Sequence, residues 1–396
     1  MTNEMDREQK VHTYILCYNE ELILSHILDY YTEISSRIFI FDNMSSDKSM
    51  EIAARYKKVT IIPFDTGGKK DNKKHIEIKS HAYKLYSREG GIFTEEVADW
   101  VICVDTDEIV YNKGLLGILA AYKNIGVTVP QLTGFNMTGE NEIKSGCSLL
   151  EQYKYGARTT NFDKCAIFDV NFDISYSLGC HPKGEGHLRM RDTPHYKSSN
   201  QYPIALLHFK DIGSLLYESA IKNFDRIGNI KKDKNGNYSG VGLHYGIFKD
   251  KGPDFSPYRS KAKRVLSDNN EVLFENFELS TSNNGIEVKK NSNKQKTIDA
   301  LRDCAIKAER FDVSISLQLM EIAQSFRPKG TVIIKKVDEY RKLLGLKKQV
   351  LDSSSILNSE KLRLSAKKAE SFDIFLTFKL LEIAKKFDDS EQLALT

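Results

Sequence analysis

The sequence lacks the features of disulfide-bonded, zinc-binding and membrane-spanning proteins. Its six cysteines stand singly, with no C-x-x-C pair and no spacing typical of a zinc site. Three of them lie in or beside apolar runs, which is typical of buried thiols in a reducing compartment. No segment approaches the roughly 18 uncharged apolar residues expected of a membrane-spanning helix. The composition therefore predicts a soluble protein.

A strong charge of one sign is also missing. A net charge of +4 over 396 residues gives no reason to expect a nucleic-acid partner. The first ten residues are polar and acidic, so we expect no secretory signal. These observations predict a cytoplasmic protein and leave peripheral contact at the inner face of a membrane open.

Strand-like and helix-like segments alternate over the first 110 residues. Apolar, β-rich runs occupy residues 11–17, 37–41, 59–64 and 100–104, and helical patterns lie between them. Continuous apolar strands separated by helices are typical of parallel sheets that are covered on both faces. The sequence therefore predicts an α/β fold with a mostly parallel sheet flanked by helices.

Three carboxylates occur within four positions at the end of the fourth apolar run. The segment WVICVDTDEIV carries Asp105, Asp107 and Glu108. Carboxylates this close repel one another unless a cation lies among them. Two aspartates one residue apart at a strand end suit Mg²⁺ or Mn²⁺, whose other positions take water and phosphate oxygens. For so short a motif, a solvated turn is the alternative interpretation.

Two other strand ends carry polar side chains of the same kind. CYNEE places Asn19 and Glu20 after the first strand, and FDNMSSD places Asp42 and Asn43 after the second. Ligands of such sheets bind at the carboxyl ends of the strands. Carboxylates and amides there are able to hydrogen-bond a base and a ribose. The three motifs together predict a nucleotide site with a metal ion.

The C-terminal part is predicted to be a separate all-α module. Residues 279–297 are rich in Ser, Asn and Lys and predict a linker before a helical module at 298–396. In that module, residues 301–326 align without gaps on 362–387, and each copy is typical of two short helices joined near a Phe-Asp pair. We expect the module to dock a protein partner or a second copy of the chain. Its excess of Lys and Arg, 22 against 16 Asp and Glu from residue 286 on, leaves an anionic membrane as an alternative.

The segments ILCYNEELILSHILDYY, IFIFDNMSSDKS and WVICVDTDEIV together resemble the family 2-like and family 92-like glycosyltransferases of the A-type nucleotide-sugar fold. The resemblance covers residues 11–111, weakens from 112 to about 227 and does not reach the repeat. It implies a metal-dependent, inverting hexosyltransferase that moves a sugar from a nucleotide diphosphate sugar, preferably a UDP-sugar, to a glycan or lipid-linked acceptor. Within a domain at 1–278, residues 1–111 would bind the donor and residues 112–278 the acceptor. The family analogy also suggests bacterial surface-polysaccharide synthesis.

The resemblance implies a role for each carboxylate. Glu20 and Asp42 match positions that contact the base and ribose. Asp105 would lie near the ribose and the metal, and Asp107 would be the main metal ligand. Glu108 would brace the site or face the acceptor, which leaves a catalytic role open.

Two histidines match looser features of the family. His208, in ALLHFKDIG, would complete the metal or diphosphate site, although its apolar neighbours also suit a core histidine. His181 or Lys183, in GCHPKGEGH, would meet the diphosphate or the acceptor.

The catalytic base is the least defined part of the prediction. An inverting transfer needs a carboxylate within hydrogen-bond reach of the acceptor hydroxyl. Glu140, in TGENE, is our choice, and Glu151 and Asp192 are rivals. A retaining mechanism, which needs no such base, stays open.

A lysine- and glycine-rich stretch, DTGGKKDNKKHIEIK, predicts a mobile basic loop over residues 65–79 with a helix beginning near 73. As a lid it would bring Lys79 or His75 to the donor. A solvated loop without function is the alternative.

Other functions remain in competition with glycosyl transfer. An aspartyl-phosphate phosphatase also has Asp-x-Asp after a strand, but there the motif follows the first strand. A nucleotidyltransferase shares the sheet but begins with a glycine-rich basic loop, which YILCYNEE lacks. A non-catalytic scaffold built on the repeats would function without Asp107.

Overall fold

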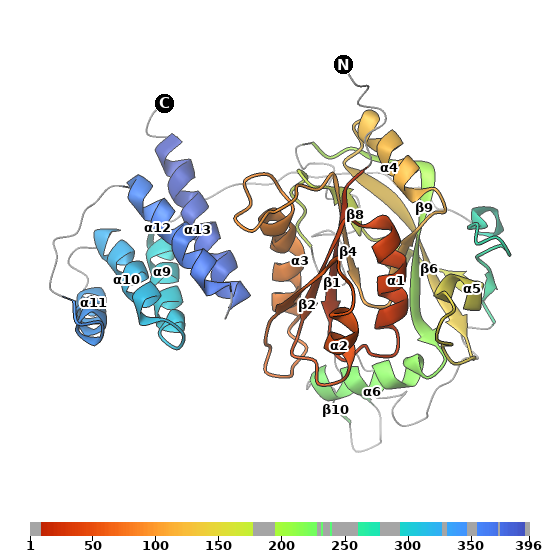
Figure 1. Ribbon diagram of the computed structural model, residues 1–396, viewed down its shortest axis with the longest axis horizontal. Helices are drawn as coiled ribbons and strands as arrows, with labels where there is room; N and C mark the ends of the chain where they lie inside the picture. Colours follow the sequence, from red (N-terminus) through yellow and green to blue (C-terminus); the bar gives the residue numbers. More distant parts are fainter. Residues whose placement is uncertain are drawn as a thin grey trace. The chain divides into compact units, whose positions relative to one another are not determined.

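The computed structural model describes residues 9–176, 195–227, 231–232, 238–239, 260–277, 294–326, 331–346, 355–370 and 373–392. The chain divides into two compact units, Met1–Glu287 and Val288–Thr396 (Figure 1). Among the described residues, no helix has both the length and the apolar character needed to cross a membrane.

The first sheet of the N-terminal unit has the strand order β3-β2-β1-β4-β8. Its strands are β1 (Val11–Cys17), β2 (Arg37–Asp42), β3 (Val59–Pro63), β4 (Trp100–Asp105) and β8 (Ile167–Asp169). The first four strands are parallel. Because Cys17 pairs with Asp42 and Leu16 with Asp105, the carboxyl ends of β1, β2 and β4 meet at one edge.

Helices cover both faces of this sheet, as the apolar strands predict. On one face, the buried side chains of α1 (Leu24–Ile34), including Tyr31, join the core formed with β1 and β2. On the other face, α3 (Asn72–Tyr86) brings Tyr86 against Phe39, which stacks on Tyr14. The aromatic layer under α3 explains why this part of the sheet is buried on both sides.

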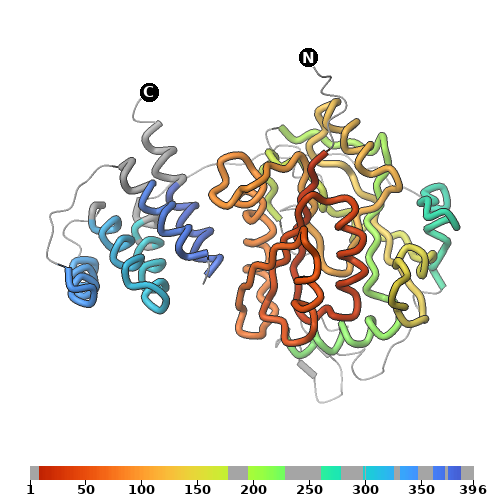
Figure 2. Tube along the Cα trace, in the orientation of Figure 1, coloured from red at the N-terminus to blue at the C-terminus, as the bar shows by residue number. Residues whose placement is uncertain are grey.

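The prediction of one mostly parallel sheet was incomplete. In the first sheet β8 pairs antiparallel with β4. A second, mixed sheet has the order β12-β7-β6-β9-β5, in which only the β6–β9 pair is parallel among the described strands. Its strands are β5 (Glu108–Tyr111), β6 (Val129–Gly139), β7 (Tyr155–Arg158), β9 (Ser198–Ile212) and β12 (Lys263–Arg264). Figure 2 shows the long β6 and β9 segments side by side.

The remaining described elements of this unit are shorter. They are α2 (Ser49–Ala53), α4 (Leu115–Asn124), α5 (Leu149–Gln152), α6 (Leu215–Ile227), the 3-10 turns Thr160–Phe162 and Phe274–Asn276, and the pair β10 (Lys231–Lys232) and β11 (Tyr238–Ser239). The longest of these helices is α6, with 13 residues. It follows β9 and returns the chain toward the end of β1, where Lys222 donates to the backbone oxygen of Asn19.

The described elements of the C-terminal unit are all helices. Its helices are α9 (Lys294–Ala308), α10 (Val313–Phe326), α11 (Thr331–Leu343), α12 (Ser355–Ala369) and α13 (Ile374–Gln392). α9 packs against α10, and α12 against α13. Each hairpin is one copy of the sequence repeat.

Corresponding positions do the same work in the two copies of the repeat. Asp312 caps α10 by accepting from the backbone N–H of Ser314, and Asp373 caps α13 by accepting from Phe375 and Leu376. Fully buried residues also recur 61 positions apart, as Leu301 and Leu362, Ala305 and Ala366, and Ala308 and Ala369. Asp312 and Asp373 therefore mark the position at which each copy starts its second helix.

Candidate functional site

The Asp-Thr-Asp-Glu segment is the point where the chain passes from one sheet to the other. β4 ends at Asp105 in the first sheet, and β5 begins at Glu108 in the second. The turn between them is held by Thr106, whose hydroxyl donates to the oxygen of Leu16, and by Asp107, whose backbone oxygen accepts from Phe209. The carboxylates are therefore fixed where two sheets meet.

His208 lies directly opposite this turn, since it pairs with Glu108 across the β5–β9 ladder. Its Nε2 is 3.5 Å from Oδ2 of Asp107. Its Nδ1 is 2.9 Å from the side-chain oxygen of Asn136, whose amide nitrogen donates to Asp211. Because Asp211 takes the amide N–H, the Asn136 oxygen accepts from Nδ1, and a neutral His208 then carries its lone pair on Nε2.

This donor set fits a divalent cation. Nε2 of His208 and a carboxylate oxygen of Asp107 face each other at 3.5 Å, and both atom types are metal ligands. Two donor atoms each about 2.1 Å from one ion lie roughly 3 Å apart when adjacent, close to the spacing seen. The relay through Asn136 to Asp211 is the kind of outer support that metal-binding histidines have. Within the described residues no group of three or more His, Cys, Asp or Glu side chains is placed to hold a metal alone, so water and substrate oxygens would supply the other ligands.

Asp105 is held by a lysine instead. Lys79 of α3 places its ammonium 2.6 Å from Oδ1 of Asp105, and Lys79 is itself buried. Burial opposes ionisation of Asp105, but the charges of Lys79 and Lys164 outweigh it and hold its pKa well below the ordinary value. Asp105 is therefore a fixed anion next to a fixed cation.

Glu108 is buried and faces inward. Its carboxylate pairs with Lys164 and accepts from the backbone N–H of Asp105 at 3.1 Å. Its backbone oxygen accepts from Tyr31 of α1. A carboxylate enclosed in this way has no path to an acceptor, so the geometry favours the bracing role over the catalytic one.

Glu20 completes the acidic edge from the side of β1. It pairs with Lys222 of α6. Burial raises the pKa of Glu20 to about 7; the carboxylates of Asp107 and Asp105 add to this effect, and Lys222 opposes it. The influence of both aspartates shows that the ends of β1 and β4 converge on one electrostatic site.

The other predicted polar residues hold loops together. Asn19 and Ser46 exchange hydrogen bonds, with the N–H of Ser46 donating to Oδ1 of Asn19 at 2.8 Å. Asp42 accepts from the N–H of Ser45, and Asn43 exchanges bonds with Thr66. In the structure, hydrogen bonds between the CYNEE and FDNMSSD motifs thus hold the ends of the first two strands together.

The lysine-rich stretch is more ordered than a lid loop. α3 begins at Asn72 with Asp71 as its cap, so residues from 72 on are helical. The preceding turn is fastened by the N–H of Lys70, which donates to the oxygen of Arg226 at 3.2 Å. Burial lowers the pKa of His75 to about 4, and its Nε2 is buried without a hydrogen-bond partner, one turn before Lys79.

Of the candidates for the catalytic base, the two that the structure describes, Glu140 and Glu151, do not lie at the turn. Glu140 is exposed just past β6, four residues after Asn136, which is about 13 Å along an extended chain. Glu151 is engaged in the capping box of α5. Asp192, His181 and Lys183 lie outside the described residues.

Sequence reasoning missed the residues that support the cluster: Lys164, Lys222, Asn136, Asp211 and Phe162. Phe162 stacks on the His208 ring with 4.1 Å between ring centroids. The only signal in the sequence was indirect, because crowded carboxylates at a buried strand end require nearby cations. Lys164 and Lys222 meet Glu108 and Glu20 across 56 and 202 positions of the chain, which no local pattern records.

Comparisons with known proteins match the chain in structure but not in sequence. No family model and no curated protein matches it. The chain is similar to S. aureus TarS 1–349 in complex with UDP-GlcNAc, with 10% identity, 87% of this chain and 95% of that chain covered, and a TM-score of 0.31. It is also similar to GalNAc-T7 with UDP, GalNAc and Mn²⁺, with 13% identity, coverage of 33% and 24%, and a TM-score of 0.24.

A third similar structure is the Mycobacterium tuberculosis glucosyl-3-phosphoglycerate synthase with Mn²⁺, UDP and phosphoglyceric acid. It shares 12% identity over 32% of this chain and 43% of that chain, with a TM-score of 0.21. All of these TM-scores lie below 0.5, too low to inform the roles of individual residues in this chain. Those roles rest on the geometry at the strand ends.

Proposed function

We propose that this chain is a metal-dependent glycosyltransferase of the A-type nucleotide-sugar fold that uses a nucleotide diphosphate sugar, preferably a UDP-sugar. The observation that carries the proposal is the pairing at the strand ends. Asp107 faces His208 at 3.5 Å, while the carboxylates on either side of it have lysine partners. One carboxylate and one imidazole are thus left facing each other, a pair suited to a hard cation.

Asp107 and His208 would hold Mn²⁺ or Mg²⁺. When bound, the cation would supply positive charge to neutralise the diphosphate of the leaving nucleotide. Asn136 orients His208, and Asp211 fixes the amide of Asn136. These residues keep the Nε2 lone pair directed at Asp107 before any ligand arrives.

The remaining groups of the site bind and position the nucleotide. The lysines near the turn, Lys79 and Lys222, offset part of the carboxylate charge, so the edge of the sheet is not purely acidic. Glu20 and Asp105, which pair with Lys222 and Lys79, are the proposed contacts of the nucleoside. Asn19, Asp42 and Asn43 act as positioning residues, since their side chains hold the two loops in register.

An inverting transfer to a glycan or lipid-linked acceptor is the finer part of the proposal. Glu140 stays the proposed base, because it is an exposed carboxylate directly after the end of β6, the strand whose Asn136 pairs with His208 of β9. Glu140→Gln should lower the rate of transfer by about a hundredfold without changing nucleotide binding. The anomeric configuration of the product, read by NMR, tests inversion itself.

The repeat unit is proposed to serve docking. Its fold is a stacked pair of helical hairpins, which suits a protein partner or a second copy of the chain, with an anionic membrane as the alternative. The setting that we propose is the cytoplasmic assembly of a bacterial surface polysaccharide.

Release of the nucleoside diphosphate tests the proposed function. The purified chain is incubated with UDP-sugars and GDP-sugars, with Mn²⁺ or with chelator, and free UDP or GDP is measured. We expect metal-dependent release from at least one donor, lowered about a thousandfold by Asp107→Asn and by His208→Ala. Release that persists in chelator or in both variants would contradict the proposal.

A further inference from the structure

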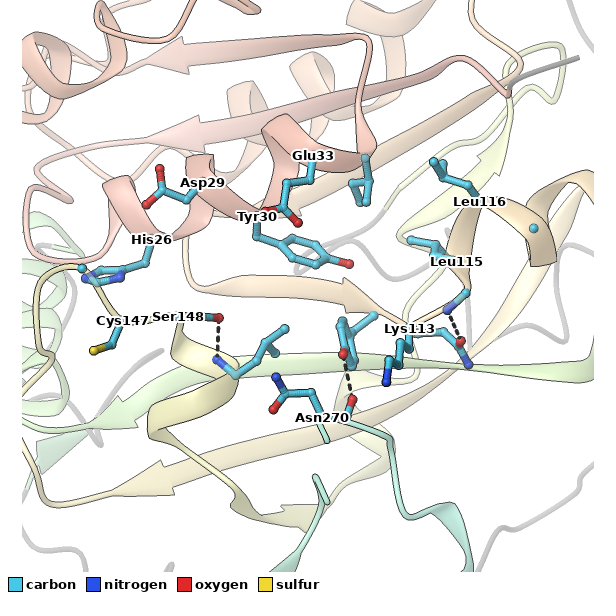
Figure 3. A pocket seen from close by; sticks show the side chains of 17 residues that line it. His26, Asp29, Tyr30, Glu33, Lys113, Leu115, Leu116, Cys147, Ser148 and Asn270 are labelled. Atoms are coloured by element: carbon cyan, nitrogen blue, oxygen red, sulfur yellow. Dashed lines mark hydrogen bonds between the residues drawn. The ribbon is translucent and has the colours of Figure 1, made fainter. Parts of the chain in front are cut away.

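A second hollow lies away from the strand-end site. A cavity of about 570 Å³ is walled by one stripe of α1, by the start of α4, by the segment before α5 and by Asn270 (Figure 3). Its volume is that of a typical small-molecule site. Tyr111, which lines it, lies three residues after Glu108 on β5, about 10 Å along the strand. None of the strand-end carboxylates lines it.

The floor of the cavity is aromatic and apolar. Tyr30 and Tyr111 lie next to each other, with ring centroids 6.0 Å apart, and Leu115 and Leu150 complete the floor. Both tyrosine hydroxyls are already used, since Tyr30 donates to the oxygen of Val110 and Tyr111 to the oxygen of Asn270. The tyrosines therefore present ring surface to a ligand rather than hydroxyl groups.

The rim is polar and leans acidic. Asp29 and Glu33 stand one turn apart on the exposed side of α1, and Lys113 stands across from them (Figure 3). Ionised carboxylates accept hydrogen bonds and donate none, so they select ligands that carry hydroxyl donors. Two carboxylates against one ammonium also disfavour an anionic ligand such as a phosphate.

We propose that this cavity binds a neutral sugar unit of a glycan. The C–H faces of a pyranose would lie on the tyrosine rings. Its hydroxyl groups would donate to Glu33 and to Oδ2 of Asp29, since Oδ1 of Asp29 already accepts from Tyr56. The role that follows, holding a distal unit of the acceptor while the reacting end lies at the strand-end site, rests on the proposed function. The proposal that the cavity binds a neutral sugar unit does not rest on the proposed function.

Gly117 offers a way to fill the cavity without disturbing the fold. It lines the cavity on α4, and a Cβ built there meets no atom within 4 Å. A Trp side chain has room at this exposed lining position, so Gly117→Trp should narrow the cavity, and Gly117→Ala is its matched control because it adds only a methyl group. For the rim, Glu33→Gln removes one acceptor charge, and Glu51→Gln on the exposed side of α2 is the control.

The test is saturation-transfer NMR with four probes: lactose, maltose, cellobiose and chitobiose, each at up to about 10 mM, enough to detect a Kd of ~1 mM. UDP binding in the presence of Mn²⁺ is measured in parallel for every variant. We expect at least one disaccharide to bind. Gly117→Trp and Glu33→Gln should each weaken it about tenfold, while Gly117→Ala, Glu51→Gln and Asp107→Ala leave it unchanged. UDP binding should not change in any of the four cavity and control variants.

Three results would overturn the inference. The first is that no probe binds the native chain. The second is that a probe binds Gly117→Trp and Glu33→Gln as well as it binds the native chain. The third is that UDP displaces the probe and Asp107→Ala abolishes its binding, which would place the probe at the strand ends. A chain that binds a disaccharide in this cavity but no nucleotide would support the cavity and refute the proposed function, so the two failures are distinguishable.

Discussion

At the scale of single residues, the carboxylates of the site differ in whether they form an ion pair with a lysine. Glu20 pairs with Lys222, Asp105 with Lys79 and Glu108 with Lys164. Asp107 faces His208 instead. This division separates the carboxylates that have lysine partners from Asp107, the one that we propose to bind a cation.

Removing Lys164 should leave a buried, uncompensated charge on Glu108. Because breaking one side of a buried pair costs much more than replacing both sides, Lys164→Met should lower the free energy of unfolding by about 3–5 kcal/mol. Urea unfolding followed by circular dichroism measures this change.

The double variant Glu108→Gln/Lys164→Met is the control for that experiment. It removes both charges and should recover most of the loss. A Lys164→Met protein within about 1 kcal/mol of the native chain would mean that Glu108 is not buried as the structure has it.

Residue identities at the site were only half visible in the sequence. The carboxylate cluster at Asp105 and Asp107 was visible because it directly follows a continuous apolar run. The lysine partners of Glu108 and Glu20 were not visible, since Lys164 and Lys222 lie far along the chain from them. Asn43 shows the converse, because its amide, predicted to meet the nucleotide, is bonded to Thr66.

At the scale of elements, β1 is joined to α3 by a buried polar chain. Ring nitrogens of His12 lie 2.5 Å from the hydroxyl of Ser87 and 3.0 Å from Glu96, and Tyr14 also bonds Ser87. The order carboxylate, imidazole, hydroxyl is that of a nucleophilic triad. Ser87 is fully buried, however, so the arrangement fastens the end of α3 to the strand rather than serving catalysis.

The hydrogen-bond network of His12, Ser87 and Glu96 makes the stability of the protein depend on pH. Burial lowers the pKa of His12; Glu96 opposes this effect, and Arg37 and Lys10 add to it. The unfolded chain then binds more protons than the folded one as pH falls below about 6.5, so folding weakens there. Burial would raise the pKa of Glu96, but hydrogen bonds from Lys10 and His12 outweigh burial and lower this pKa to about 2. The contribution of Glu96 to the free energy of unfolding is therefore lost only as pH falls below about 4.5.

We therefore expect the free energy of unfolding to fall between about pH 7 and pH 5, and less steeply in His12→Gln. Urea titrations at several pH values give both slopes. Equal slopes for the native chain and His12→Gln would contradict a buried, neutral His12.

Gly134 of β6 tests how closely the second sheet supports His208. A Cβ at this position would lie 2.4 Å from the backbone of Phe162, whose ring stacks on His208. Gly134→Ala should therefore cost about 1–3 kcal/mol of stability through overpacking and also weaken metal binding. Gly117→Ala, where the space is open, should be neutral or stabilising by up to about 1 kcal/mol. Thermal unfolding and Mn²⁺ titration compare the two, and equal effects would contradict the close approach.

The elements were predictable where their pattern is continuous. β1, β2, β3 and β4 are apolar runs that match the predicted strands within a residue or two. The second sheet escaped prediction because its ladders join strands far apart in the sequence, as β5 with β9. A local sequence pattern does not indicate which distant strand will pair with it.

At the scale of the whole molecule, the chain consists of two units, each with its own core. Residues 1–287 contain every described residue of the strand-end site. A chain that ends at residue 287 should therefore bind UDP and Mn²⁺ with the affinity of the full chain, within about threefold. Calorimetry on both chains checks this, and a loss of binding on truncation would show that the repeats contribute to the site.

The central claim is that Asp107 and His208 hold a cation with a nucleotide diphosphate. Calorimetric titration of the full chain with UDP, in Mn²⁺ and in chelator, tests it most directly, with Asp303→Ala in the C-terminal unit as the control for an exposed aspartate. We predict that UDP binds at least tenfold more tightly in Mn²⁺, that Asp107→Ala abolishes this gain, and that Asp303→Ala keeps it. Equal binding of UDP with and without metal, or a gain that survives in Asp107→Ala, would contradict the account.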